Sequence, residues 1–300
     1  MNCTFRDLND SASVIPFPPF PHYGRPSRSP SPESRASSRS RSPRYRRRSR
    51  SPIGDCRKPV IYLFSPEPLP NVSVSVRLVP QWTFTHVYPL SDKPTAMQDS
   101  KRSITWSVST NPDGSLIHKD TGIELSYLFW EAVASPHTPP PSPRSDPVHE
   151  AQLPLNVTEV FDPANSSLSP ETPMAVLLPL EQLLPYLDHV LQRLTLHTAA
   201  RNDFITYWLP KLSQQPYVAL RFLPQAVYER AAELEVQPVP DVMTRVFMLF
   251  RGVRAEDVDA WANARKRVTQ IDWVDIVGIM PEAHDRSVFR VLEWGAMEVC

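Results

Sequence analysis

Apolar and polar residues alternate along much of residues 58–134, which is typical of β-strands with one buried face. Residues 60–64 are wholly apolar, which suits a strand buried on both faces. Further strands are predicted around residues 72–78, 82–88, 104–108, 116–117 and 123–129. Glycines close two predicted turns, at 111–114 and 119–122, where a positive φ is needed. This spacing of short strands indicates an antiparallel sheet or sandwich.

Helical spacing replaces this alternation in the second half of the chain. Leucines at three- and four-residue steps predict a helix over 180–194, and Pro185 should kink or restart it. Thr198 should cap a second helix, which Pro210 limits or bends. Strands are predicted at 217–223, 231–236, 242–250 and 288–299, with a short helix at 257–267. The fold class expected is therefore α+β: an antiparallel, β-rich domain with a pair of helices in its second half.

Two segments have compositions that do not support a packed core. Residues 25–52 contain ten arginines, ten serines and one acid, so we expect residues 1–57 to form a disordered arm. Residues 135–173 contain ten prolines, and we expect them to be a disordered insertion. Residues 1–58 carry a net charge of +9 and the remaining residues −9. We therefore expect a single folded domain, residues 58–299, which the insertion interrupts.

The numbers and positions of proline, glycine and cysteine residues, and the lack of long apolar runs, argue against several classes of protein. The chain has 35 prolines but only 7 glycines, and no two glycines are close enough for a dinucleotide or phosphate-binding loop. Its 3 cysteines are far apart, which argues against a disulfide framework and a structural zinc site. We find no signal peptide and no apolar run long enough for a membrane span. These features predict a cytoplasmic or nuclear protein, not secreted, without metal or cofactor.

Six segments, in order along residues 58–299, resemble those of a bacterial protein family with relatives in fungi. That family opens with a KPVIYLYP-like block, and the segments here are KPVIYLF (58–64), NPDGSLI (111–117), SYLFWE (126–131), NDFITYWLP (202–210), VMTRVFM (242–248) and VLEWG (291–295). The match departs at Phe64-Ser65, Ala132 and Asp203, where the family has Tyr-Pro, Gly and Glu. The resemblance implies one domain assembled from both halves of the chain, and it assigns no activity.

Acidic and aromatic residues lie together in three of these segments. If the segments converge, they would place carboxylates beside flat apolar rings, as in a cleft for a sugar or small polar ligand. The alternative is that the aromatic rings are core and the acids are capped, paired or exposed. The candidate catalytic residues are Glu131, Asp203 and Glu293, and the candidate ligand-binding residues are Trp130, Tyr207, Trp208, Arg245 and Trp294.

Arg245 lies in the middle of a predicted central strand, where a charge has to be paired or exposed. We expect it to pair with Glu131, Asp203 or Glu293, of which Glu131 and Glu293 are preferred because strands place side chains face to face. The other interpretation is that its guanidinium binds an anion.

The arm suggests a separate set of partners. Kinases are expected partners, because four serines of the arm precede proline and are phosphorylation candidates: Ser29, Ser31, Ser42 and Ser51. Its Arg/Ser tracts resemble the tails of splicing factors, and P-x-x-P matches at 136–143 suit proline-binding modules. The leading hypothesis is a non-enzymatic interaction or ligand-binding domain with a phosphorylatable arm. The alternatives are a hydrolase or carbohydrate-active enzyme using the three acids, and an RNA-associated protein that binds weakly and non-specifically through the arm.

Overall fold

The computed structural model describes residues 55–90, 102–134 and 159–299, all of which belong to one compact unit. The predictions for residues 1–54, including the four candidate serines, and for residues 135–158 lie outside the described residues. The last three residues of the predicted disordered arm, 55–57, instead begin the first strand, β1 (Asp55–Phe64). Within the described part, the chain is an α+β fold in which more residues belong to strands than to helices. The sequence therefore predicts the fold class correctly.

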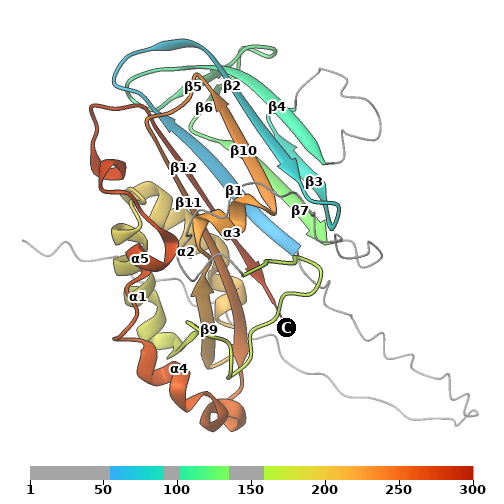
Figure 1. Cartoon of the computed structure of the whole chain (residues 1–300), viewed down its shortest axis with the longest axis vertical. Coiled ribbons are helices and arrows are strands. Elements are labelled where there is room, and N and C mark those ends of the chain that lie inside the picture. Colours follow the sequence, from blue (N-terminus) through green and yellow to red (C-terminus); the bar gives the residue numbers. More distant parts are fainter. Residues whose placement is uncertain (1–54, 91–101, 135–158, 300) are drawn as a thin grey trace, which may run out of the picture. The chain divides into compact units, whose positions relative to one another are not determined.

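The larger sheet contains strands from both halves of the chain (Figure 1). In spatial order its described strands are β3 (Trp82–Tyr88), β7 (Leu128–Ala134), β1 (Asp55–Phe64), β12 (Arg290–Glu298), β11 (Val242–Val253), β9 (Tyr217–Phe222) and β8 (Val176–Pro179). Every pair is antiparallel except β11 and β12, which run parallel. The chain's two halves therefore meet at the contact of β1 with β12.

The smaller sheet is wholly antiparallel among the described residues. Its order is β10 (Ala232–Gln237), β2 (Leu69–Leu78), β4 (Ser103–Thr110), β5 (Leu116–His118) and β6 (Glu124–Leu125). The alternation read from β2 is confirmed, because Val72, Val74 and Val76 are buried. The predicted turn before β5 is also present: Gly114 has φ +88° and donates its N–H to Asn111 at 3.0 Å.

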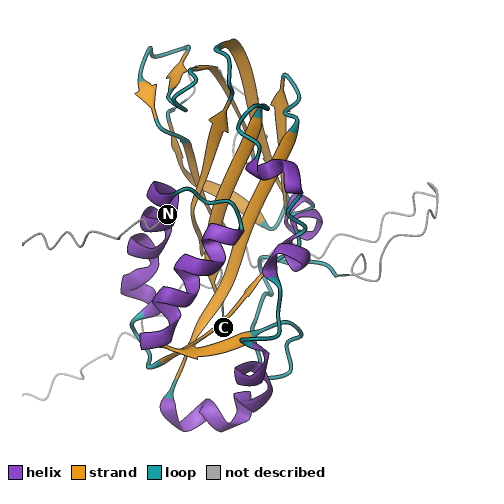
Figure 2. Ribbon diagram, turned by 90° about the vertical axis from the view of Figure 1, so that its left-hand side faces the viewer, coloured by secondary structure: helices purple, strands orange, loops and turns teal. Residues whose placement is uncertain are grey.

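Helices cover one face of the larger sheet, and the smaller sheet packs against the other (Figures 1 and 2). The covering helices are α1 (Leu180–Arg193), α2 (Thr198–Leu212) and the short α5 (Trp273–Val277). The other short elements are α3 (Gln225–Glu229), η1 (Ala255–Trp261), α4 (Ala262–Arg267) and η2 (Pro281–His284). α3 packs on the same side as the smaller sheet.

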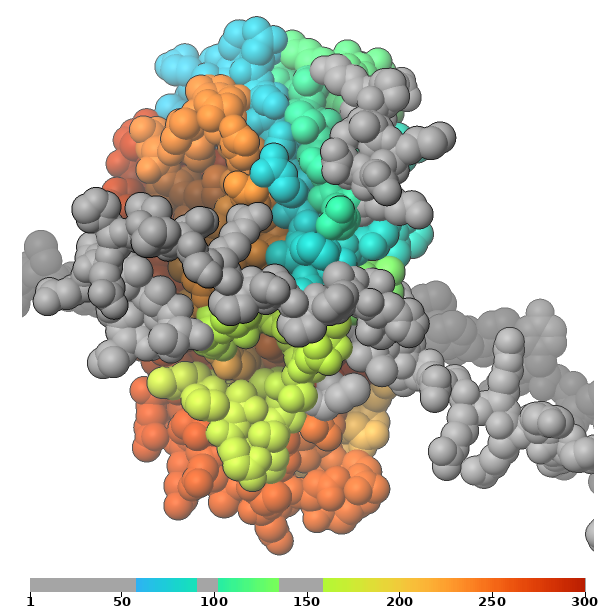
Figure 3. Space-filling view, turned by 45° about the vertical axis from the view of Figure 1, so that its right-hand side comes forward, coloured from blue at the N-terminus to red at the C-terminus, as the bar shows by residue number. Residues whose placement is uncertain are grey.

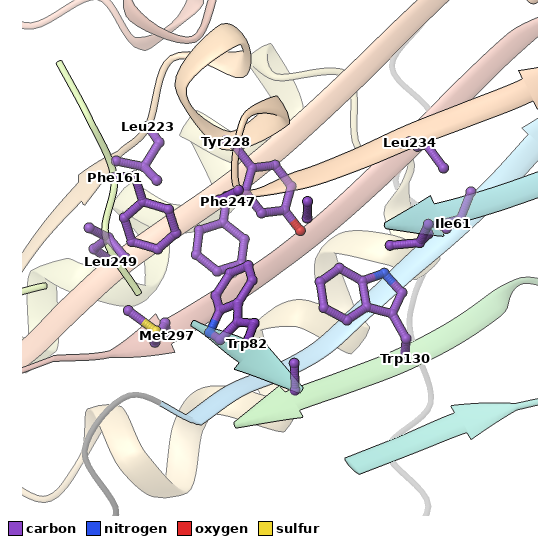
Figure 4. Packing of buried hydrophobic residues seen from close by; sticks show 14 of the residues in the cluster. Ile61, Trp82, Trp130, Phe161, Leu223, Tyr228, Leu234, Phe247, Leu249 and Met297 are labelled. Carbon is purple, nitrogen blue, oxygen red and sulfur yellow. The ribbon is translucent and has the colours of Figure 1, made fainter. Parts of the chain in front are cut away.

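Each central strand contributes alternate side chains to two different cores. Along β11, Val246 and Met248 face the helices, whereas Phe247 and Leu249 face the smaller sheet. Figure 4 shows the second core, where Trp82, Trp130, Tyr228 and Phe247 lie close together although they come from four different elements. A pair of neighbouring residues on such a strand is therefore divided between two environments.

The helix boundaries correct three details of the sequence analysis. α1 runs unbroken through Pro185, which neither ends nor restarts it. The N-cap of α2 is His197 rather than Thr198, because the His197 Nδ1 atom accepts the Ala200 N–H at 3.3 Å. Pro210 lies inside α2, which continues to Leu212. Packing of the apolar face stabilises these helices more than local propensity does.

Two other expectations also need correction. The strand predicted at 123–129 is divided into β6 and β7, with the break at Ser126 and Tyr127. Residues 159–173, assigned to the disordered insertion, instead pack on the domain, since Leu168 is fully buried and Phe161 lies in the inter-sheet core. Figure 3 shows this segment in yellow-green, beside the orange-red residues around α4. Arg267 fixes its end by donating to the Ala175 carbonyl at 2.9 Å.

Candidate functional site

Two clusters of charged side chains lie on opposite faces of the larger sheet. They arise because the dipeptides Trp130-Glu131 on β7 and Glu293-Trp294 on β12 each send one side chain to each face. On β7 the tryptophan enters the inter-sheet core and the acid faces α2. On β12 the order is reversed, so Glu293 enters the inter-sheet core and Trp294 faces the helices.

The first group, which we call the buried cluster, consists of Arg245, Glu293, Trp130, Glu229 and Tyr228. Arg245 and Glu293 are direct partners in the register of β11 and β12, so their side chains leave the sheet on the same face. The Arg245 Nε atom donates to Glu293 Oε2 at 2.6 Å, and the Trp130 indole donates to Glu293 Oε1 at 3.0 Å. Both oxygens of this acid therefore accept a hydrogen bond.

Helix α3 encloses Arg245 from the other side. The Arg245 Nη1 atom donates to the Glu229 carboxylate and to the Ala232 carbonyl, the latter at 2.6 Å. The guanidinium lies 4.5 Å from the centre of the Tyr228 ring, which itself stacks on Phe247. Hydrogen bonds, an aromatic face and two carboxylates thus surround one cation. This arrangement leaves it 2% exposed.

Charge and burial act together on the pKa values of the buried pair. Burial raises the pKa of Glu293 above that of an ordinary glutamate, although Arg245 and Trp130 oppose this effect. Burial lowers the pKa of Arg245, but the charges of Glu293 and Glu229 outweigh it and raise the pKa above that of a free arginine. Arg245 is therefore always charged. Glu293 is the member of the pair whose pKa is raised by burial.

The second group, which we call the open cluster, consists of Lys58, Asp203, Tyr207, Glu131 and His86. Lys58 lies at a bulge in β1 and has φ +52°, an uncommon conformation for a residue other than glycine. Its Nζ atom lies 3.7 Å from Asp203 Oδ2, 5.0 Å from the Tyr207 ring centre and 5.5 Å from the Trp294 ring centre. The bulge thus places an ammonium group between two aromatic rings and an acid.

Glu131 connects strand β3 to helix α2 within the open cluster. The Tyr207 hydroxyl donates to Glu131 Oε1 at 2.9 Å, and His86 Nδ1 lies 3.1 Å from Glu131 Oε2. His86 is the register partner of Glu131 on β3 and is 70% exposed. Asp203 is 43% exposed, in contrast with the fully buried Glu293. Solvent therefore reaches this side of the sheet.

Two adjoining cavities open beside the open cluster. One, of about 590 Å³, is lined by Lys58 and Tyr207 among others, and the next, of about 430 Å³, by Asp203, Tyr62 and others. Both include Ser126 and Tyr127 in their walls, so the two cavities adjoin, and we call them together the groove. Burial, and secondarily the charge of Asp203, raises the pKa of both Tyr62 and Tyr127. Their hydroxyl groups therefore remain protonated donors at neutral pH.

The structure divides the candidate residues predicted from the sequence among three places. The predicted pairing of Arg245 with Glu293 is confirmed, and these residues lie with Trp130 in the buried cluster. Asp203, Tyr207 and Glu131 lie in the open cluster, with Trp294 beneath Lys58. Trp208 is in the core, where its ring packs on Phe250. The three candidate carboxylates therefore do not converge in one pocket.

Sequence reasoning missed several residues that complete these clusters. Glu229 and Gln225 come from a five-residue helix without a long periodic pattern, and Gln225 Oε1 accepts the Arg245 N–H at 2.6 Å. Lys58 belongs to the first shared segment, but the sequence does not signal its positive φ, because a following proline favours an extended conformation. Within the described ranges, no group of three His, Cys, Asp or Glu is placed to hold a metal ion.

Comparison with models of protein families, with curated proteins and with solved structures yields no match. Among the helices that the structure describes, none is both long and apolar enough to cross a membrane. The geometry of the two clusters is therefore the basis for any statement about function.

Proposed function

We propose that the folded domain is a non-enzymatic ligand-binding module that takes a small polyhydroxylated molecule, such as a neutral saccharide, in the groove of the open cluster. One observation carries the proposal: a half-exposed carboxylate, Asp203, lies in a groove walled by Tyr62 and Tyr127, with Lys58 beside it. Carboxylates accept hydrogen bonds from sugar hydroxyls, and flat rings pack on the apolar faces of sugars.

The buried cluster supports a binding role more than a catalytic one. Acid–base chemistry on a glycosidic bond uses two carboxyl groups that both reach the substrate. Glu293 is 0% exposed and held by Arg245 and Trp130, so it does not reach the groove. The proposal includes the family that the six shared segments suggest. Four of these segments contribute residues to the walls of the groove.

The proposal also retains the phosphorylatable arm as a separate interaction segment. Its support is the composition of residues 25–52, where arginines alternate with serines that precede proline. Phosphorylation adds about −1.5 to −2 charges per serine and would reverse the positive charge of this segment.

A saccharide titration tests the groove directly. A panel of neutral mono- and disaccharides is titrated against the full chain by ligand-observed NMR and calorimetry. Asp203→Asn should weaken binding by about tenfold or more, because a hydrogen bond to a charged group contributes about 1.5–3 kcal/mol. Glu235→Gln is the matched control, since Glu235 is exposed on β10 and lies in the smaller sheet.

The same samples separate binding from catalysis. Intact saccharides after long incubation support a binding module. Release of reducing ends that is lost in Glu131→Gln or Asp203→Asn would favour the hydrolase alternative. Failure of every saccharide to bind, or binding that Asp203→Asn leaves unchanged, refutes the groove proposal.

A further inference from the structure

A third cavity lies next to the groove and has a different chemical character. It has a volume of about 420 Å³ and shares Phe64 and His197 with the groove. Arg286, Arg290, His197 and His284 line it, and no carboxylate is among the residues of its wall. The part of the chain that follows the arm is net acidic, so a cavity wall with two arginines and two histidines but no acid differs from the rest of the domain.

The arginines of this cavity are incompletely neutralised. Arg290 packs its guanidinium over the Phe64 ring at 5.3 Å and donates through Nη1 to the Ala283 carbonyl at 3.3 Å. Its Nε atom is buried and has no hydrogen-bond partner within the described residues. The nearby acid Asp285 accepts from the N–H and the hydroxyl of Ser287. Burial and the charge of Arg286 lower the pKa of Arg290, and the opposing charge of Asp285 does not outweigh them. A buried donor without a partner is costly, so a ligand atom that accepts here would be favoured.

Helix α2 adds a favourable potential at the same place. His197, its N-cap, belongs to the cavity wall, and the 15-residue helix has no acidic residue in its first turn. The N-terminus of a helix attracts negative charge, which an acid in that turn would otherwise supply. The positive end of α2 and two arginines therefore act on the same cavity.

We infer that this cavity, which we call the cationic pocket, binds an oxyanion: a phosphate, sulfate or carboxylate, free or carried by a small ligand. Arg286 and Arg290 would supply charged donors, and a planar guanidinium suits the oxygens of such groups. The inference goes beyond the saccharide proposal. The cationic pocket adjoins the groove but does not depend on a ligand there, so each can fail without the other.

Titration with simple oxyanions tests the inference. Inorganic phosphate, sulfate and acetate are titrated in turn against the full chain at constant ionic strength with chloride, and binding is followed by calorimetry and NMR. We expect saturable binding of at least one of them, weakened at least fivefold by Arg286→Gln. Arg286 is exposed, so this substitution should leave the fold intact. Arg290→Gln should weaken binding further.

Two control variants make the result specific. Arg254→Gln removes an exposed arginine that pairs with Asp257 and Glu256 far from the cavity in sequence, and it should leave oxyanion affinity unchanged. Asp203→Asn removes a negative charge beside His197, so it should not weaken oxyanion binding, whatever it does to saccharide binding. Absence of binding by all three oxyanions, or equal weakening by Arg254→Gln and Arg286→Gln, overturns the inference. The second result would reveal a general charge effect.

Discussion

The two charged clusters are built from the same kinds of residue but have opposite surroundings. In the buried cluster a cation and an acid meet at 2.6 Å with 2% and 0% of their side chains exposed. In the open cluster the Lys58 and Asp203 side chains are 3.7 Å apart and 16% and 43% exposed. Water competes for the second pair but not for the first. The contrast teaches that enclosure, more than residue type, decides whether solvent reaches a charge pair.

The largest expected effect comes from removing the central cation. Arg245→Ala should lower the free energy of unfolding by about 3–5 kcal/mol, because it leaves the carboxylate of Glu293 buried without its partner. Urea unfolding followed by tryptophan fluorescence measures this. The double variant Arg245→Met with Glu293→Gln should lose less than Arg245→Ala, since no uncompensated charge remains. A loss below 1 kcal/mol for Arg245→Ala would mean that the cluster is solvated.

A second comparison removes one hydrogen bond from a glutamate in each cluster. Trp130→Phe deletes the indole donor to Glu293 and should cost about 2–3 kcal/mol, because a buried acceptor is left without a partner. Tyr207→Phe deletes the hydroxyl donor to Glu131 and should cost about 1 kcal/mol, because water can replace it. Thermal and urea unfolding of both variants check the order. The reverse order would remove the distinction between the two environments.

The sequence predicts the features that arise from local patterns of burial, but not those that depend on how distant strands pair. Strict alternation in β2 predicted its buried face correctly, and the leucine stripe predicted α1, because both patterns are local consequences of burial. The sequence predicts a partner for Arg245 among three acids of the shared segments, and strand geometry favours Glu131 and Glu293. The choice of Glu293 required the parallel register of β11 and β12, which no local pattern determines.

Other parts depend on contacts that are distant in sequence. Glu229 reaches Arg245 from a five-residue helix, too short to show a period. Leu168 looked like part of a disordered insertion because prolines surround it, yet its burial depends on strands far away in the chain. A cleft formed by the three acids and their neighbouring rings was one of two alternatives in the sequence analysis. The structure divides these residues between two faces of the sheet, and this division follows from the parity of each strand position.

A smaller effect is the pH dependence of the free energy of unfolding, which we expect from His197 at the start of α2. Burial, and next the charge of Arg201, lowers the pKa of His197, whose Nδ1 atom must be unprotonated to cap α2. Below the ordinary histidine pKa of about 6.5 the unfolded chain binds a proton that the folded one does not. The free energy of unfolding should therefore fall as pH decreases from about 6.5 through the lowered pKa.

Substitution of the cap isolates this dependence. His197→Asn keeps a side-chain acceptor for the Ala200 N–H but cannot titrate, so the pH dependence should flatten. His189→Asn is the matched control, because His189 is exposed on α1. Urea unfolding at several pH values between 5 and 7.5 measures both, at roughly constant salt. An unchanged slope in His197→Asn would assign the dependence to another group.

The smallest effect is expected from the arm. Deletion of residues 25–52 should leave the melting temperature unchanged, because this segment is too polar to contribute apolar burial. It should nevertheless abolish binding to heparin or RNA at low salt, because the rest of the chain is net acidic. Scanning calorimetry and a heparin column measure the two properties. Retention of the truncated protein on heparin would move polyanion binding from the arm to the folded domain.

The most direct test of the account is a pair of double-mutant cycles in urea, one for each cluster. Arg245→Met is combined with Glu293→Gln, and Lys58→Met with Asp203→Asn. Contact pairs show coupling energies of about 0.5–3 kcal/mol. We expect about 2–3 kcal/mol for Arg245 with Glu293, and less than about 0.5 kcal/mol for Lys58 with Asp203, whose charges remain accessible to solvent. Equal coupling energies in the two cycles would contradict the assignment of one cluster to the fold and the other to a ligand.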